Sequence, residues 1–498
     1  MSETILAVDA GTTGVTALVV DARARVVSRG YREFAQSFPG DGLVEHDPNA
    51  IWAAVLAASG EALAGGQATG ASTPRAVGVT NQRETAVVWD RTTLEACRPA
   101  IVWQDRRTAA ICSEYRDAGA EARVSALTGL RLDPYFTATK LTWLARNEPG
   151  VWDQVTSGRA ALGTVDSYLI ARMTAGRQHV TDASNASRTL LFDLERGAWS
   201  PELCDLFGVP IGALPQVVPS YGTVGRTVGS AFCGLDVPIA GIAGDQQAAL
   251  FGQTCFLPGM SKCTYGTGSF VLATTGPVPV RSAAGLLTTV AWGHPDGRLD
   301  YALEGAVFVT GAAVQWLRDG LGMIGTAPEV EALARTVADS GGVVFVPALT
   351  GMGAPDWDPR ARGAIFGITR GTSRGHLARA TLEAIAFEVE DIVDVMVRGA
   401  GLAVPTLAVD GGASANDLLC QLQADQLQIP VLRPVTQETT GLGAAFLAGL
   451  GVGVWADVAD LSEVWQLDRR FEPGPRNDDG HRRWRQAVEH AKGWAAEI

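Results

Sequence analysis

The chain has 498 residues, which is enough for two or three domains. Of these residues 47% are hydrophobic and 19% are charged, a composition typical of a globular protein. Its formal net charge of −13 argues against broad electrostatic binding to DNA, RNA or an anionic membrane surface. Any polyanionic ligand should therefore be small and held locally.

The sequence also carries no sign of export or of membrane insertion. The first residues, MSETILAVDAGTTG, lack the basic start and continuous apolar run of a secretory signal. The apolar stretch at 441–455 is too short and too rich in glycine for a bilayer span, so we expect a buried helix and turn there. The seven cysteines show no zinc-ligand spacing, and free thiols in the cytoplasm are the expectation.

The first half of the chain begins with a predicted β-meander. Branched apolar runs at 4–9, 15–21 and 26–31 are separated by a glycine-threonine turn and a charged turn. Asp47 can cap a helix that starts at Pro48, because the residues that follow have apolar positions at helical spacing. Further along we expect strands near 76–80 and 86–89 and a helix near 106–118.

The opening pattern recurs near 262–274, where two apolar runs again flank a glycine-threonine turn. Either an internal duplication or a chance likeness of two hairpins would explain this recurrence. The second half then predicts the following elements in order: a strand at 342–349, a long helix over 373–398, a strand ending at Asp410 and a helix after Asn416. We expect domains over 1–250 and 251–498, pressed together around a cleft.

Several classes of nucleotide-binding protein are excluded by their missing motifs. Lysine occurs only at 140, 262 and 492, and none of the three completes a P-loop. The sequence contains no H-R-D or D-F-G triplet of a protein kinase and no G-x-G-x-x-G after its first strand.

Three glycine loops could instead hold a nucleotide. In the first, Gly11, Thr12, Thr13 and Gly14 offer backbone amides and hydroxyls to phosphate, and Asp9 can hold hydrated Mg²⁺. The loops at 266–269 and 410–414 have the same character. Each loop alone is also explained as a structural turn, but the three together favour a nucleotide clamp.

Two polar clusters are candidates for a substrate pocket. Asp245 follows an apolar run, where it either caps the helix after it or faces the cleft as a base. Arg83 and Glu84 follow another apolar strand and form either a solvated loop or a donor and acceptor for a hydroxylated ligand. Trp103 and Tyr135 could line such a pocket, or could simply be core residues.

Over nearly its whole length the sequence resembles the FGGY carbohydrate kinases, and among them the members that phosphorylate glycerol. The resemblance rests on ordered motifs, which include VEHDP at 44–48, TNQRET at 80–85, VTDASNASRTL at 180–190, GIAGDQQAALFGQ at 241–253, YGTGSF at 265–270 and YALEGAVF at 301–308. Two longer FGGY-type signatures lie at 135–147 and 363–383.

This resemblance implies an α/β fold of two actin-like, ribonuclease-H-like ATPase domains flanking a central cleft. It implies ATP-dependent phosphorylation of glycerol to sn-glycerol 3-phosphate, with ATP and Mg²⁺ required and a homodimer or homotetramer as the assembly. Asp245 would be the general base, and Asp9 would hold Mg²⁺ through water with Asp245 nearby.

The resemblance also implies a role for each residue that matches a family motif. The glycerol hydroxyls would bind Arg83, Glu84, Tyr135, Asp245 and Gln246, and the glycerol carbons would contact Trp103 and Phe270. The nucleotide would bind Gly11, Thr12, Thr13, Gly14, Thr267, Gly311, Gln315, Gly412 and Asn416.

Three positions depart from the family pattern. Thr16 stands where an arginine is usual near the phosphates, Ala10 replaces a more usual glutamine, and Asp356 replaces a tyrosine. Two other functions remain open at this point. One is a kinase for a different polyol or ketose, and the other is an actin-like protein that kept the nucleotide clamp and lost phosphoryl transfer.

Overall fold

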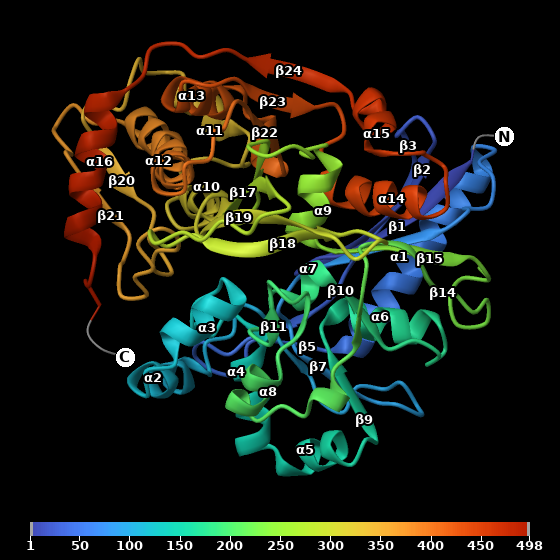
Figure 1. Cartoon of the computed structure of the whole chain (residues 1–498). Helices are drawn as coiled ribbons and strands as arrows, with labels where there is room; N and C mark the ends of the chain where they lie inside the picture. The colour runs from blue at the N-terminus through green and yellow to red at the C-terminus, as the bar shows by residue number, and fades with distance from the viewer. Residues whose placement is uncertain (1–2, 496–498) are drawn as a thin grey trace.

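The computed structural model describes residues 3–495 and contains two large mixed β-sheets, one from each half of the chain (Figure 1). In spatial order the first sheet contains β14 (Tyr221–Arg226), β15 (Pro238–Gly244), β6 (Val77–Asn81), β1 (Thr4–Ala10), β2 (Gly14–Asp21) and β3 (Val26–Glu33). The second contains β18 (Leu287–Gly293), β19 (Leu299–Val307), β17 (Ser269–Gly276), β16 (Ser261–Tyr265), β22 (Leu407–Asp410), β23 (Val431–Pro434) and β24 (Leu467–Phe471).

Six strands of each sheet have the same pairing pattern, and the second sheet has β18 as an additional edge strand. Each sheet contains a glycine-threonine hairpin, formed by β1 and β2 in the first sheet and by β16 and β17 in the second. The strand beside the hairpin is antiparallel to it, β3 in the first sheet and β19 in the second. On the other side of the hairpin two parallel strands follow, β6 and β15 or β22 and β23, and an antiparallel edge strand ends the set. This repeated topology supports duplication over a chance likeness of two hairpins.

Two helices rich in small residues lie between the sheets. These are α9 (Asp245–Gly252) and α14 (Thr439–Gly451), which cross in close contact. A Cβ atom on Gly443 would lie 1.8 Å from the carbonyl oxygen of Ala248, so this crossing requires a residue without a side chain. The buried helix predicted at 441–455 is confirmed, and it packs on the sheet formed by the first half of the chain.

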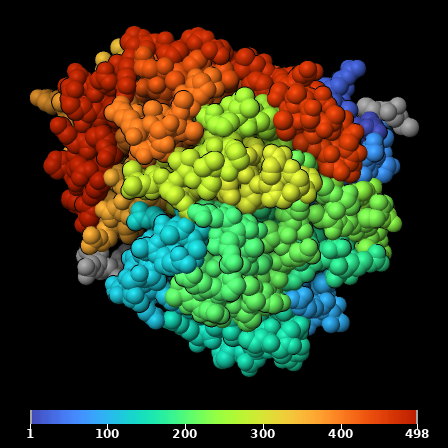
Figure 2. Space-filling model, viewed as in Figure 1, coloured from blue at the N-terminus to red at the C-terminus, as the bar shows by residue number. Residues whose placement is uncertain are grey.

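A large insertion between β6 and β15 forms the lower part of the molecule in Figure 1. It contains β7 (Val87–Asp90), β8 (Ala100–Ile101), β9 (Ala160–Gly163), β10 (Val180–Asp182), β11 (Phe192–Asp193), β12 (Ala198–Trp199) and β13 (Gln216–Val218), and the helices α2 (Ala109–Asp117), α3 (Glu121–Thr128), α4 (Thr137–Asn147), α5 (Pro149–Thr156), α6 (Val165–Met173), α7 (Ala183–Ala186) and α8 (Pro201–Phe207). On the face shown in Figure 2, a yellow band of second-sheet residues separates the cyan and green insertion from the orange and red C-terminal part.

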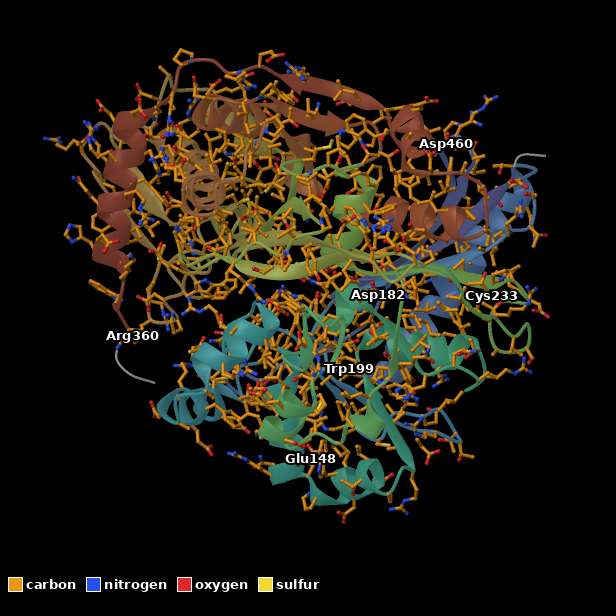
Figure 3. All side chains as sticks on the ribbon, in the orientation of Figure 1. Glu148, Asp182, Trp199, Cys233, Arg360 and Asp460 are labelled. Carbon is orange, nitrogen blue, oxygen red and sulfur yellow. The ribbon has the colours of Figure 1, made fainter. Side chains whose placement is uncertain are left out.

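Asp182, the last residue of β10, lies near the centre of the molecule in Figure 3. Its carboxylate accepts hydrogen bonds from the backbone amides of Ser184 and Asn185 at the start of α7 and from the Ser220 hydroxyl, 2.6 Å away. This buried cap holds α7 against β15, because the Ser184 hydroxyl in turn accepts from the backbone amide of Gly244.

The remaining elements cover the outer faces of the sheets and form small accessory strands. They are β4 (Gln36–Ser37), β5 (Glu45–His46), α1 (Pro48–Ala68), α10 (Gly311–Asp319), α11 (Glu329–Ala334), β20 (Val344–Val346), β21 (Ala364–Phe366), α12 (Arg374–Asp394), α13 (Asp417–Leu427), α15 (Val458–Val464) and α16 (Asp478–Ala491). Within residues 3–495 no helix is long and apolar enough to cross a membrane. All seven cysteines are free thiols, as expected.

Most predicted elements are confirmed, including the meander, the Asp47-capped helix α1 and the strand that ends at Asp410. The helix expected at 106–118 begins only at Ala109, because the Asp105 carboxylate binds both the backbone amide and the guanidinium of Arg107 and holds a turn there. The strand expected at 342–349 is reduced to β20, which pairs only with β21. The helix expected to reach residue 398 is α-helical only to Asp394 and continues as a π-helical turn over Val395–Gly399.

Candidate active site

The residues predicted to bind a polyol meet where β6 and β15 end, at the edge of the first sheet. Because parallel strands place their carboxyl ends on the same edge, Arg83 after β6 and Asp245 after β15 become neighbours. The Arg83 Nε atom lies 3.2 Å from the Asp245 Oδ1 atom. Asp245 occupies the first position of α9, its side chain is 25% exposed, and burial raises its pKa although Arg83 opposes the rise.

Aromatic side chains from three segments form a wall beside this pair. The Trp103 ring centroid lies 5.6 Å from that of Tyr135 and 6.4 Å from that of Phe270 on β17, both in edge-on geometry. Phe270 also lies over the Arg83 guanidinium, at 5.8 Å from its ring centroid. The Tyr135 hydroxyl accepts a hydrogen bond of 3.2 Å from Arg83 Nη2, so the wall presents both apolar and polar surface.

Glu84 and Gln246 complete the predicted polyol set, and each is held by a neighbouring charged side chain. Glu84 is buried with a positive φ of 61°, and its Oε1 atom accepts a 2.6 Å bond from Arg188 Nε. Burial raises the pKa of Glu84, and Arg188 and Arg83 act against that rise. Gln246 accepts a 2.5 Å hydrogen bond from the buried Lys262 Nζ atom.

The hairpin between β1 and β2, which carries Gly11, Thr12, Thr13 and Gly14, adjoins the polyol set. The Trp103 indole donates a 3.0 Å hydrogen bond to the Thr12 hydroxyl, and Gln82 donates to the Gly11 carbonyl oxygen at 3.1 Å. Asp9, at the end of β1, has a buried Oδ1 atom with no hydrogen-bond partner among the described residues. Burial and the charges of Asp245 and Glu438 raise the Asp9 pKa well above its usual range.

The predicted nucleotide residues of the second half gather at the matching edge of the second sheet. The Thr267 carbonyl oxygen accepts bonds from the backbone amides of Thr310 and Ala312, which places Gly311 beside the hairpin of β16 and β17. Gln315 follows on α10 and is exposed.

Gly412 and Asn416 lie in the loop after β22, next to that hairpin. The loop can lie there because Gly411 has a φ of +81° and no side chain. A Cβ atom at this position would lie only 2.5 Å from the Tyr265 carbonyl oxygen. The Asn416 Oδ1 atom accepts from the backbone amide of Leu419 and caps α13, and its amide nitrogen is available to donate to another group.

Four charged residues at this site were not singled out from the sequence. Glu304, Arg188, Lys140 and Lys262 are all buried, and each is bonded to a predicted pocket residue. The signal that could have found Glu304 is a lone carboxylate inside the apolar run YALEGAVF, since a buried charge requires a partner.

Two of the three departures from the family pattern have a structural account. Asp356 accepts from Lys492 at 2.7 Å and pairs with Arg485, so it fastens α16 to the loop before Trp357. Thr16 lies on β2 directly opposite Asp9 on one side and Tyr31 on the other, which places a neutral hydroxyl beside the Asp9 carboxylate. Nothing in the structure explains Ala10, which is fully buried.

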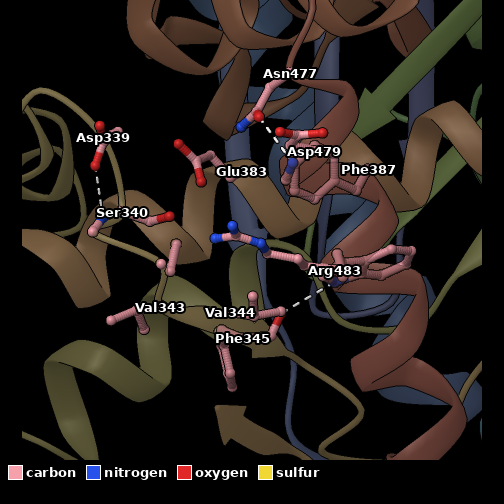
Figure 4. Close-up of a pocket in the computed structure, with 15 residues that line it drawn as sticks. Asp339, Ser340, Val343, Val344, Phe345, Glu383, Phe387, Asn477, Asp479 and Arg483 are labelled. Carbon is pink, nitrogen blue, oxygen red and sulfur yellow. Dashed lines mark hydrogen bonds between the residues drawn. The ribbon is translucent and has the colours of Figure 1, made fainter. Parts of the chain in front are cut away.

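A separate cavity of about 230 Å³ lies between β20, α12 and the start of α16 (Figure 4). Figure 4 shows Arg483 reaching across it from α16, with Glu383 and Asp479 nearby. None of the predicted site residues lines this cavity, so the polyol and nucleotide predictions concern a different place in the molecule.

Two sheets of repeated topology, each with a glycine-threonine hairpin, and one polar and aromatic pocket beside the first hairpin define a two-domain kinase of the actin-like fold. The models of the N-terminal and C-terminal domains of the FGGY family of carbohydrate kinases match residues 4–252 and 261–452. The chain therefore belongs to this family.

Two bacterial glycerol kinases are among the proteins similar to this chain. The glycerol kinase of Trichlorobacter lovleyi is 54% identical, with 99% of each chain covered, and glycerol kinase 2 of Thermotoga maritima is 50% identical, with 98% of this chain and 99% of its own covered. Among solved structures, Plasmodium falciparum glycerol kinase with ADP has a TM-score of 0.91 at 32% identity, with 98% of each chain covered.

Proposed function

We propose that this protein transfers the γ-phosphoryl group of ATP to glycerol and forms sn-glycerol 3-phosphate, with Asp245 as general base. The observation that carries the proposal is the position of the partly exposed Asp245 carboxylate, between the Arg83 and Tyr135 pocket and the Asp9 hairpin. The glycerol kinases that match at 50 to 54% identity over almost the full chain support the choice of substrate.

The proposed pocket suits a three-carbon polyol. The hydroxyl groups of the polyol would meet a set of side chains that offers both donors and acceptors: Arg83, Glu84, Tyr135, Asp245 and Gln246. The carbon chain would lie against Trp103 and Phe270, whose edge-on rings present apolar surface.

The nucleotide would lie between the two hairpins, on Gly11, Thr12, Thr13 and Gly14 from one half and on Thr267, Gly311, Gln315, Gly412 and Asn416 from the other. Asp9 fits the role of holding Mg²⁺ through water, because its buried Oδ1 atom has no protein partner within residues 3–495 and faces the field of two other carboxylates. When bound, Mg²⁺ would neutralise charge on the β- and γ-phosphates.

In this reaction the main tasks of the chain are to position the two substrates and to accept one proton. As the glycerol oxygen bonds to the γ-phosphorus, the bond from that phosphorus to the ADP oxygen breaks, and the alcohol proton passes to Asp245. A raised pKa suits Asp245 to this task, since a stronger base accepts the proton more readily. Backbone amides of the glycine hairpins would oppose the charge that develops on the phosphoryl oxygens.

The experiment that tests the proposal is product identification with ATP, Mg²⁺ and a panel of polyols and ketoses. We expect glycerol to give the highest kcat/KM and sn-glycerol 3-phosphate as product. Faster turnover of erythritol, dihydroxyacetone or xylulose would contradict the substrate, and tight glycerol binding without any product would favour a clamp that lost transfer.

The role of Asp245 has its own test. We expect Asp245→Asn to bind glycerol in calorimetry but to lose about 10²-fold or more in kcat, because the amide cannot accept the alcohol proton. A kcat close to that of the wild-type enzyme would reject Asp245 as the base.

We also infer a domain boundary near residue 250, a cytoplasmic location and a homodimer or homotetramer. The gap between the two matched regions, 4–252 and 261–452, supports the boundary. The seven free thiols support a reducing compartment. Light scattering on the purified protein would measure the assembly directly.

A further inference from the structure

Glu304 is a fully buried carboxylate held between two arginines. Its Oε2 atom accepts a 2.5 Å bond from Arg83 Nη1, and its Oε1 atom accepts bonds of 3.1 Å from Arg83 Nη2 and 2.9 Å from Arg188 Nη2. The exposed fractions of these three side chains are between 0 and 2%. Burial alone would raise the Glu304 pKa, but Arg188 and Arg83 lower it to about 2, so Glu304 is an anion at neutral pH.

The two arginines and the carboxylate come from different halves of the chain. Glu304 lies in the middle of β19 in the second sheet, whereas Arg83 follows β6 of the first sheet and Arg188 follows α7. Two residues after Glu304, Ala306 pairs with Phe270 on β17, and the Phe270 ring covers Arg83. The second sheet therefore contacts the Arg83 guanidinium through both an ion pair and an aromatic ring.

Four of the five N–H donors of Arg83 make hydrogen bonds within the protein, and Glu304 accepts two of these bonds. The other donors point to the Gln247 side chain, to the Tyr135 hydroxyl and to Asp245. The two-point contact with Glu304 fixes the plane of the guanidinium, which leaves its Nε and Nη2 edge facing the pocket.

Through Arg188 the same carboxylate also acts on Glu84. Arg188 gives one donor to Glu304 and one, at 2.6 Å, to Glu84 Oε1, so the charges alternate from Asp245 to Arg83, Glu304, Arg188 and Glu84. Removing the central negative charge would leave two buried arginines to compete for Glu84 and Asp245, and both would leave their present orientation.

We propose that Glu304 is a positioning residue for the polyol: from the second sheet it sets the orientation of Arg83 and Arg188, and so of the hydroxyl-binding groups in the first. This inference rests on the proposed polyol pocket. It assigns to Glu304 no contact with substrate and no part in proton transfer.

The test is steady-state kinetics of Glu304→Gln, which keeps the shape of the side chain and removes its charge. We expect the glycerol KM to rise about 30-fold, the scale of a lost hydrogen bond to a charged group, with the ATP KM within about twofold of wild type. Glu304→Asp, which keeps the charge on a shorter side chain, should restore part of the glycerol affinity.

Glu383→Gln is the matched control, because Glu383 is another buried glutamate of the second half, paired with Arg379 at 2.8 Å on α12 and outside the polyol pocket. It should leave the glycerol KM unchanged. A glycerol KM within threefold of wild type for folded Glu304→Gln would overturn the proposal. Equal rises in the KM of glycerol and ATP, or no rescue by Glu304→Asp, would also overturn it, since a general loss of structure would explain either result.

The outcome is separable from that of the proposed function. The wild-type substrate panel is measured first, and the KM comparison uses whichever polyol that panel selects. If no polyol is turned over, calorimetric titration of glycerol into wild type and Glu304→Gln replaces the kinetics. A wild-type affinity for glycerol that the variant retains, or no binding by either protein, would then contradict the role of Glu304.

Discussion

At the scale of single residues, one lysine organises the backbone of the polyol pocket. Lys140 Nζ donates to the carbonyl oxygens of Tyr135, Phe136 and Glu84, at 2.5, 3.3 and 3.5 Å. The side chain is fully buried, and burial lowers its pKa to about 8 although nearby carboxylates act in the opposite direction. It thereby joins the segment that carries Tyr135 to Glu84, whose left-handed backbone requires support.

We expect Lys140→Met to weaken glycerol binding and to lower the free energy of unfolding by about 2 kcal/mol, because the carbonyl oxygens of Tyr135, Phe136 and Glu84 each lose a charged donor. Urea unfolding and the glycerol KM measure the two effects. Lys492→Met removes a partly exposed lysine just after α16, together with its ion pairs to Asp356 and Glu489, and should change neither quantity by as much; equal losses in both variants would contradict the assignment.

Residue types and order could predict which side chains form the pocket, but not how they are held. Arg83, Tyr135 and Asp245 carry recognisable motifs, and the structure brings them together. The supporting charges Glu304 and Arg188 lie more than a hundred residues apart in sequence, and their pairing depends on the packing of two sheets. No local spacing contains that information, so their roles could not be derived from the chain alone.

At the scale of elements, the two hairpins were predictable because a hairpin is specified locally by branched apolar runs and a turn. The side-chain contacts that hold the first hairpin in place were not predictable from the sequence. Gln82 donates from one amide nitrogen to the Gly11 carbonyl oxygen and to His46 Nδ1 on β5, at 3.1 and 3.2 Å. His46 must be neutral to accept this bond, and burial lowers its pKa from 6.5 to about 4.

This geometry predicts a pH dependence of stability. Because His46 binds a proton less readily when folded, its contribution is complete above pH 6.5 and is lost as the pH falls towards 4. The loss should reach about 3 kcal/mol, and unfolding measured from pH 7 to 4.5 should show a shallower slope for His46→Asn. The variant keeps the buried His179, whose pKa burial also lowers to about 4, so some slope should remain. An unchanged slope would contradict this account.

The crossing of α9 and α14 makes a second prediction for an element. We expect Gly443→Ala to destabilise the protein by about 2 kcal/mol or more, because its Cβ would overlap the Ala248 carbonyl. Gly60→Ala on α1 is the matched control, since a Cβ there meets nothing within 4 Å and should be neutral or slightly stabilising. Thermal unfolding compares the two; similar melting temperatures for both variants would contradict the close crossing.

At the scale of the whole molecule, the order of the chain and the packing of the two halves differ. The helix α14 comes from the second half but packs on β1, β6 and β15 of the first sheet, whereas α9 ends the first half and contacts both sheets, at β6 and β15 and at β16 and β17. Duplication could be inferred from the repeated hairpin. The packing of α14 on the sheet of the other half could not, because this helix is a run of small apolar residues that would fit either sheet.

We therefore expect a fragment of residues 1–255 to fail to fold alone, because the face that α14 covers would be exposed. Co-expression with residues 256–498 should restore soluble complex and activity. Circular dichroism and urea unfolding of the single fragment provide the measurement, and a cooperative transition of the fragment by itself would show that α14 is dispensable for folding of the first half.

The alternating charges around Glu304 also constrain how substrate preference can change in evolution or by design. Replacing Arg83 or Glu304 singly leaves the buried row of charges unbalanced, because each of the two residues loses its strongest partner, so an exchange at either position should require a compensating change nearby. Trp103 and Phe270 carry no charge and face the same ligand. Libraries that seek longer or bulkier acceptors should therefore diversify these two aromatic positions and leave the ionic row intact.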